Sequence, residues 1–305
     1  MEKDIVFHIG APRTATTVLQ KYVLSELKNY YYLSKVPFGS SGLVAGKSSL
    51  RNEYSSDFIS SILRDEPLVD DEKIDFFKFV FGLLSIKMAT FPNSDELAQM
   101  FRRAFLRISK STGDFKGALI SMERFVDTSA SLNGDSLHQS KSDQSFPVYQ
   151  TLRRAYEFGF SPRVLVVLRD PIQYLRSKYC RTFYQRRSSR SRQITPIEYI
   201  DKQCKLESQF PGTSALSVAM HSSFVRSLAN FSYVKAIGFK DLVGSDNVFQ
   251  AIGLPGELAI DFSALPVENS LRIPGVDHAS LCKDIKSALI RNHYYDKIAA
   301  EKMYE

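Results

Sequence analysis

Cysteine is scarce in this sequence, which contains three cysteines among 305 residues. Cys180, Cys204 and Cys282 do not fall into the short spacings that zinc sites and redox-active pairs require. This scarcity argues against a disulfide framework and is typical of a reducing compartment. We therefore expect the three side chains to be small apolar fillers of the core.

Long hydrophobic runs are also missing. The most apolar stretch, residues 76–91, is interrupted by Lys78 and Lys87. It is shorter than the roughly 20 apolar residues that a membrane-spanning helix needs. No signal peptide is evident, because the first expected strand begins at about Asp4. We therefore expect a soluble, cytoplasmic protein with no transmembrane segment.

Acidic residues are outnumbered by basic ones, at 33 against 40, which gives a net charge of +7 and a pI near 9.1. Such an excess favours anionic ligands through electrostatic steering and says nothing about the fold. No segment resembles a nucleic-acid-binding motif, so we expect no nucleic-acid partner. The oligomeric state is left open by the sequence.

Four apolar segments are expected to form strands: residues 4–9, 117–122, 163–168 and 233–238. Continuous apolar strands are typical of a parallel sheet that is covered on both faces. Segments with helical spacing separate them, which favours right-handed crossovers. The sequence therefore predicts an α/β fold, a three-layer sandwich with a central parallel sheet of four or five strands, as one domain over residues 1–305.

Helical spacing dominates the region between the first two of these strands. Residues 53–112 show it with breaks at Pro67, Pro92 and Asn93, which predicts an all-α insertion. Residues 31–50 are rich in Gly and Ser and are expected to form a loop. Further helices are expected over residues 16–29, from 147 and 171 onward, over 196–208 and 213–230, and from about 277.

The loop after the first strand has the length of a phosphate-binding loop. Gly10 to Thr17 ends in the required hydroxyl, but Ala15 stands where that loop has its second glycine and Thr16 where it has lysine. Arg13 is the only cation in the loop. Free N–H groups and the dipole at the following helix N-terminus favour an anion. The pattern indicates a ligand with phosphates but no γ-phosphate; an ordinary strand, turn and N-cap is the alternative.

A second candidate site follows the strand of residues 163–168. Arg169 comes directly after this strand, and Ser177 lies eight residues further on. Asp170 is expected to cap the intervening helix and Pro171 to begin it. Side chains at the carboxyl ends of parallel strands point into the crevice where such folds bind ligands. A structural ion pair for Arg169 and a solvated Ser177 are the alternatives.

Four segments together resemble the sulfotransferases that use 3′-phosphoadenosine 5′-phosphosulfate (PAPS), a family with a fold like that of P-loop nucleotide triphosphatases. HIGAPRTATTVLQ resembles the family's 5′-phosphosulfate loop, and VLVVLRDPIQYLRSKY resembles its 3′-phosphate segment. ALISME, which ends at Glu123, is similar to a Ser-Ser-Glu strand end of bacterial members. FKDLVGSDNVFQAIGLP resembles a late segment of the family.

The resemblance implies a donor site formed by Gly10, Pro12, Arg13, Thr14, Ala15, Thr16, Thr17, Arg169, Ser177 and Arg272. In such a site the loop holds the 5′-phosphate, and Arg13 contacts the bridging and sulfuryl oxygens as a catalytic residue. Arg169 and Ser177 hold the 3′-phosphate, which Arg272 covers. No metal ion is required. Ala15 departs from the family's glycine.

The implied reaction transfers the sulfuryl group of PAPS to a hydroxyl or amine of an acceptor, such as a glycan or a small alcohol, and releases adenosine 3′,5′-bisphosphate. Glu123 is the expected base for the acceptor proton. Because an ordinary glutamate has a pKa of about 4.3, burial or a nearby like charge has to raise it. His8 and His138 are the alternative bases.

Two other functions stay open. A P-loop nucleotide kinase or phosphotransferase needs a lysine near Thr16 and an acidic magnesium ligand, and neither is evident. A degenerate, non-catalytic member that binds an anion or a partner is favoured by Ala15.

The remaining candidates are the arginines Arg181, Arg186, Arg187, Arg190 and Arg192. They either contact an anionic acceptor, close over the donor, or form a solvated helix end.

Overall fold

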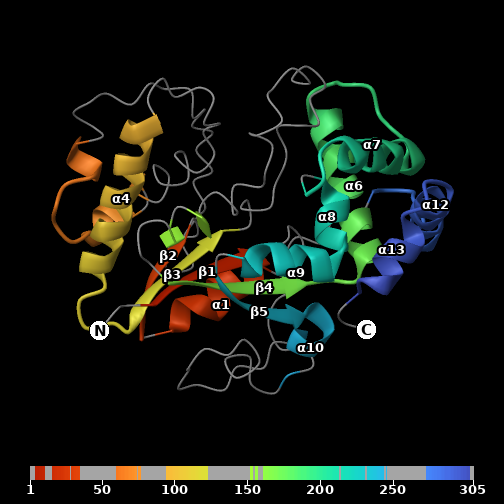
Figure 1. Ribbon diagram of the computed structural model, residues 1–305. Helices are drawn as coiled ribbons and strands as arrows, with labels where there is room; N and C mark the ends of the chain where they lie inside the picture. Colours follow the sequence, from red (N-terminus) through yellow and green to blue (C-terminus); the bar gives the residue numbers. More distant parts are fainter. Residues whose placement is uncertain are drawn as a thin grey trace.

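The computed structural model describes residues 4–10, 16–27, 29–34, 60–73, 75–76, 94–122, 152–153, 155–156, 161–212, 214–230, 232–243, 245 and 273–302. Within them the chain forms a five-stranded sheet in the order β2-β3-β1-β4-β5 (Figure 1). The strands are β1 (Asp4–Gly10), β2 (Tyr30–Ser34), β3 (Gly117–Met122), β4 (Pro162–Leu168) and β5 (Tyr233–Gly238). Every pairing is parallel, which confirms the predicted fold class.

β2 corrects the sequence interpretation, which assigned residues 31–50 to a loop. Tyr30–Ser34 pairs with β3 at the edge of the sheet, and its first four side chains are buried. Aromatic residues favour strands because they pack well on a pleated, half-buried surface. The run of tyrosines was masked by the Gly- and Ser-rich composition of the residues that follow it.

The helices of the described residues are α1 (Thr16–Tyr22), α4 (Ser94–Ser111), α6 (Pro171–Ser188), α7 (Pro196–Gln209), α8 (Ala215–Ala219), α9 (His221–Ala229), α10 (Phe239–Val243), α12 (His278–Arg291) and α13 (Tyr295–Ala300), with 3₁₀ turns η1 (Leu24–Glu26) and η2 (Asp70–Glu72). Two expected helices are shorter than predicted. The helix expected over 16–29 ends at Tyr22, and the one expected over 213–230 is divided at Met220.

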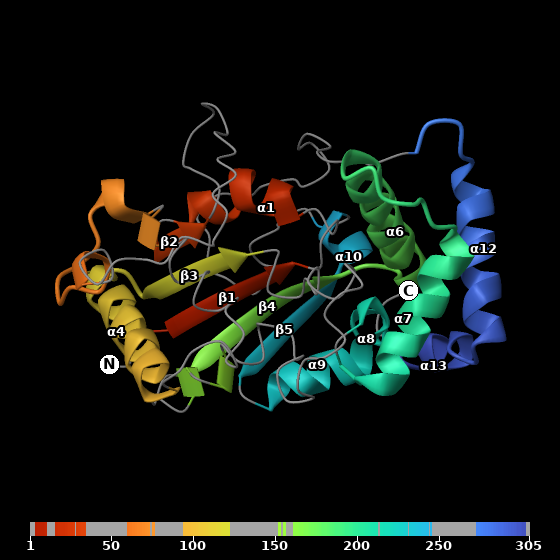
Figure 2. The ribbon, with the colours of Figure 1, turned by 90° about the horizontal axis from the view of Figure 1, so that it is seen from above.

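Helices cover both faces of the sheet, as the sandwich prediction requires. In Figure 1, α1 and α10 lie below the sheet, whereas α4 and α9 lie above it. Seen from above in Figure 2, α6, α7, α12 and α13 gather at the end toward which β4 points, and α4 lies at the opposite end. The carboxyl ends of the central strands therefore face the larger helical group.

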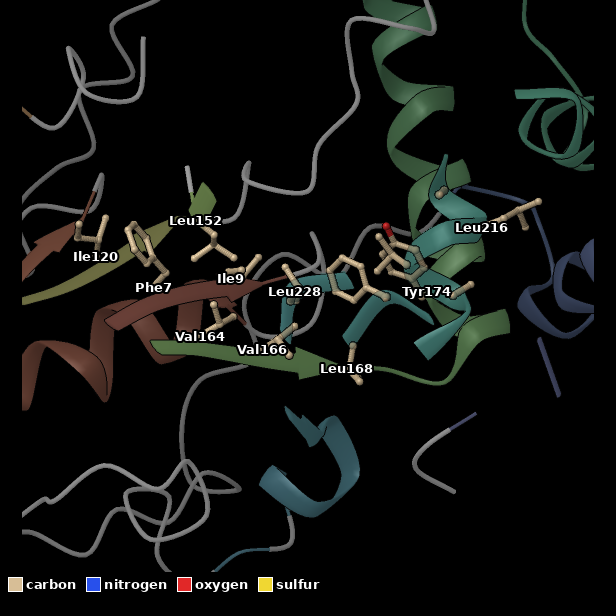
Figure 3. Close-up of a cluster of buried hydrophobic side chains, with 14 of the residues drawn as sticks. Phe7, Ile9, Ile120, Leu152, Val164, Val166, Leu168, Tyr174, Leu216 and Leu228 are labelled. Atoms are coloured by element: carbon tan, nitrogen blue, oxygen red, sulfur yellow. The ribbon is translucent and has the colours of Figure 1, made fainter. Parts of the chain in front are cut away.

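Side chains of β1 alternate between two buried clusters. Phe7 and Ile9 pack into the cluster on the α9 side, which Figure 3 shows with Val164, Val166 and other residues of the neighbouring elements. Val6 packs into the cluster on the α1 side. A strand with both faces buried needs an almost unbroken apolar sequence, and residues 5–9 depart from it only at His8.

The starts of α6 and α7 follow from local sequence. Asp170 caps α6 by accepting a 2.9 Å hydrogen bond from the backbone N–H of Gln173, with Pro171 in the first turn. This confirms the predicted cap. Thr195 and Glu198 form a capping box at the start of α7.

The expected helical insertion over residues 53–112 is helical in α4, but residues 64–69 are not. A buried arginine of α4 contacts residues between 62 and 72. Arg107 is 1% exposed, forms a 2.7 Å ion pair with Glu72, and donates hydrogen bonds to the carbonyl oxygens of Glu66 and Ile62. Its guanidinium also lies over the ring of Phe76. These partners compensate the burial of its charge.

Candidate functional site

The carboxyl ends of β1 and β4 lie side by side. Gly10, the last residue of β1, is paired with Val167, and Leu168 ends β4 one residue later. The chain after Gly10 and the residue Arg169 therefore leave the same edge of the sheet on adjacent strands. This is the edge at which open parallel sheets bind their ligands.

The loop itself falls between two described elements. Pro12, Arg13, Thr14 and Ala15 lie outside the described residues. α1 begins at Thr16, the residue at which a helix was expected, although the side chains of Thr16 and Thr17 are not described.

Arg169 carries a partly desolvated cation at this edge. Its guanidinium carbon lies 5.3 Å from the ring centroid of Phe239, the first residue of α10. Burial lowers the pKa of Arg169 from its ordinary value, the nearby charge of Arg176 acts in the same direction, and Asp170 opposes both. An arginine remains charged after such a change. Because a partly buried cation is less well solvated than an exposed one, this position favours an anionic ligand.

Ser177 lies further from the edge than Arg169. It belongs to α6 and is half-buried, two turns after the Asp170 cap. Seven helical residues correspond to about 10 Å along the helix axis. The guanidinium of Arg169 is directed toward Phe239 at the β5–α10 junction. A single phosphate that contacts both residues must therefore lie between them.

Glu123 follows the last residue of β3, Met122, which is paired with Ile9 of β1. Its own placement lies outside the described residues, as do those of His138 and Arg272. The strand that precedes Glu123 nevertheless ends at the same edge as β1. Its predicted role as the base stays a prediction.

His8 is part of a buried polar network between β1, β3 and α1. Its Nδ1 lies 2.6 Å from Oγ of Ser121, which also accepts a 2.9 Å hydrogen bond from Gln20. The hydroxyl of Tyr32 donates to the backbone carbonyl of Gln20 at 3.1 Å. Burial lowers the pKa of His8 to about 3, and its side chain has no exposed surface. Both facts argue against His8 as the base that takes a proton from an acceptor.

Sequence reasoning missed a second group of residues at the end of β4. His221, the first residue of α9, is 2% exposed and forms a hydrogen bond to the backbone of Arg169. Burial lowers its pKa to about 4. Nζ of Lys302 lies 3.3 Å from Oδ2 of Asp170. Only the Asp170 cap had a local sequence signal, since the partners are distant in sequence.

The five arginines lie in the second half of α6 and in the turn after it. Arg187 and Arg190 are exposed, and Arg192 forms a 2.8 Å ion pair with Glu198. Arg187 stands about 25 Å along the helix axis from Pro171. This distance argues against closure of that end of α6 over a ligand bound beside Arg169, and leaves an anionic acceptor or a solvated helix end.

Among the described residues, no group of three or more His, Cys, Asp or Glu side chains is arranged to hold a metal ion. None of the helices in the described ranges is both long and apolar enough to cross a membrane. Comparison with protein-family models, curated proteins and solved structures finds no match. The ligand of this chain therefore has to be inferred from the residues at the carboxyl ends of its strands.

Proposed function

We propose that this chain is a PAPS-dependent sulfotransferase that acts in the cytoplasm on a hydroxyl or amine of a small molecule or glycan. The observation that carries the proposal is the adjacency of β1 and β4, whose carboxyl ends lie side by side at Gly10 and Val167. PAPS has phosphate groups on both sides of its ribose. A donor of that shape needs two anion sites at a short separation on one edge of the sheet.

The donor's 3′-phosphate is assigned to Arg169 and Ser177. Stacking on Phe239 and partial burial restrict the guanidinium of Arg169, which lowers the entropy that binding must remove. Planar guanidinium groups also match phosphate oxygens in a bidentate geometry. The 5′-phosphosulfate is assigned to the loop of Pro12, Arg13, Thr14 and Ala15 and to the start of α1 at Thr16 and Thr17.

The chemical step is an in-line displacement at sulfur. A bond forms between the acceptor oxygen or nitrogen and sulfur, and the bond from sulfur to the 5′-phosphate oxygen breaks. Glu123 takes the acceptor proton, and adenosine 3′,5′-bisphosphate leaves with the bonding electrons. Arg13 stabilises the charge that develops on the leaving oxygen, a contribution on the order of 3–4 kcal/mol for a preorganised donor.

Binding calorimetry tests the donor assignment. We expect adenosine 3′,5′-bisphosphate to bind more tightly than adenosine 5′-monophosphate and than ATP–Mg²⁺. Arg169→Ala should weaken binding of the bisphosphate by about tenfold to a hundredfold, because a charged hydrogen bond contributes about 1.5–3 kcal/mol. The same change should leave adenosine 5′-monophosphate almost unaffected, since that ligand lacks the 3′-phosphate.

Arg163→Ala is the matched control. Arg163 lies on the same strand at its amino end, where its guanidinium carbon is 5.5 Å from the ring centroid of Tyr233. Arg163→Ala therefore removes the same charge and the same kind of stacking as Arg169→Ala, but at the opposite end of β4. Tighter binding of ATP–Mg²⁺, or equal losses in the two variants, would refute the assignment. Transfer of ³⁵S from labelled PAPS to a panel of glycans and alcohols then tests catalysis directly.

A further inference from the structure

Residues 301 and 302, which follow α13, return to the carboxyl edge of the sheet. The carbonyl oxygen of Glu301 accepts hydrogen bonds from the backbone N–H and the hydroxyl of Ser222, at 3.2 and 3.1 Å. Its carboxylate accepts a 3.0 Å hydrogen bond from the backbone N–H of Ser223. Both serines lie in the first turn of α9, where N–H groups lack partners within the helix. Glu301 is therefore fixed to the start of α9.

Lys302 continues from this anchor to Asp170. Its Nζ lies 3.3 Å from Oδ2 of Asp170, and the two side chains are 23% and 34% exposed. The other carboxylate oxygen, Oδ1, accepts the N–H of Gln173 and caps α6. Each oxygen of Asp170 thus has its own partner, one that holds the helix and one that compensates the charge.

The backbone of Arg169 is held from the same direction. His221, which begins α9 next to the serines bound by Glu301, forms a hydrogen bond to it. Arg169 is therefore bound by His221 of α9, and Asp170 is bound by Lys302. α9 and residues 301–302 also bind each other, through Glu301. Preorganised charges bind a ligand more tightly because less freedom is lost on binding.

We propose that Lys302 is a positioning residue that favours binding of the donor's 3′-phosphate at Arg169 by compensating the charge of Asp170. This inference rests on the proposed function. Asp170 already acts on the charge of Arg169. Without Lys302, the Asp170 carboxylate loses its ion pair and its negative charge acts more strongly on Arg169. It then attracts the guanidinium and repels a dianionic phosphate at the same site.

The experiment compares bisphosphate affinities of charge variants. Lys302→Met, which keeps an apolar stem, should weaken binding of adenosine 3′,5′-bisphosphate by about threefold to tenfold. Adenosine 5′-monophosphate should bind as it does to the wild type. The matched control is Lys297→Met, which removes the same charge from α13, where Nζ lies 5.0 Å from the ring centroid of Tyr294. It should leave both affinities unchanged.

A double variant separates charge compensation from folding. Asp170→Asn keeps a side-chain oxygen for the α6 cap, since Asn is as good a cap as Asp, and removes the charge that Lys302 compensates. Lys302→Met with Asp170→Asn should therefore recover most of the lost bisphosphate affinity. No recovery, or no loss in Lys302→Met alone, would overturn the inference while the wild type still binds the bisphosphate. A wild type that fails to bind it would overturn the proposed function and this inference together.

Discussion

His8 places a titratable ring where water does not reach. Its Nε2 has no hydrogen-bond partner among the described residues, while Nδ1 is bound to Ser121. Burial lowers its pKa from 6.5 to about 3, so the folded protein keeps the ring neutral. The unfolded chain binds a proton there at higher pH. Stability therefore falls as pH decreases from about 6.5 toward about 3.

We predict that urea denaturation will give a smaller pH dependence for His8→Asn than for the wild type between pH 7.5 and 5. Each pH unit below the unfolded pKa removes up to about 1.4 kcal/mol per histidine from the free energy of unfolding. Asn retains an oxygen that can accept from Ser121 but does not titrate. His221 is present in both proteins, so the difference isolates His8. Equal slopes would show that His8 does not stay neutral.

The contacts of some single residues could be predicted from the sequence, and those of others could not. The Asp170 cap was predictable because its partner Gln173 is three residues away. The ion pair of Asp170 with Lys302 was not, because only the packing of α9 and α13 brings these residues together. The role of Glu123 remains a prediction, supported by the position of the strand end before it.

At the scale of elements, α6 and α12 end in the same way. Arg190 and His293 each follow the helix with a positive φ, of 55° and 59°. After Arg190, the N–H of Ser191 donates to the carbonyl of Arg186 at 2.9 Å, and Tyr294 donates equivalently to Leu289. Glycine is the usual residue in this left-handed position because a side chain is strained there.

Arg190→Gly should therefore stabilise the protein. We expect the free energy of unfolding to rise by about 0.5–1 kcal/mol, measured by urea denaturation at neutral pH. Arg187→Gly removes the same charge from the last turn of α6 and should instead destabilise it, by up to about 1 kcal/mol, because glycine disfavours the helical conformation that this residue adopts. If both variants are destabilised alike, strain at Arg190 is not the reason.

Four of the five strands were predictable because each is a largely apolar run, and in β1, β3 and β4 almost every described side chain is buried. β5 is less buried, since Tyr233 and Lys235 are exposed. β2 was not, since its tyrosines precede a polar stretch that dominated the local composition. The break at Met220 was missed for a different reason. Ser214 and Ser217 form a capping box for α8, and all five of its residues are buried, but no glycine or proline marks its end in the sequence.

At the scale of the whole molecule, ligand binding and folding are linked. A ligand that binds only the folded chain raises the free energy of unfolding by about 2.7 kcal/mol when its concentration is a hundred times its dissociation constant. We predict this increase for the wild type with adenosine 3′,5′-bisphosphate in urea titrations. At the same ligand concentration the free energy of unfolding should rise less for Arg169→Ala, whereas for Arg163→Ala it should rise as much as for the wild type. Equal gains in the two variants would contradict the site.

The sheet order has a consequence for synthesis on the ribosome. β1 occupies the centre of the sheet, but its neighbours β3 and β4 are encoded about 110 and about 160 residues later. At about 5–20 residues per second, the nascent chain exposes this apolar strand for on the order of ten seconds before its second neighbour emerges. Production of the protein should therefore depend on chaperone capacity, and slower growth at reduced temperature should favour its recovery in native form.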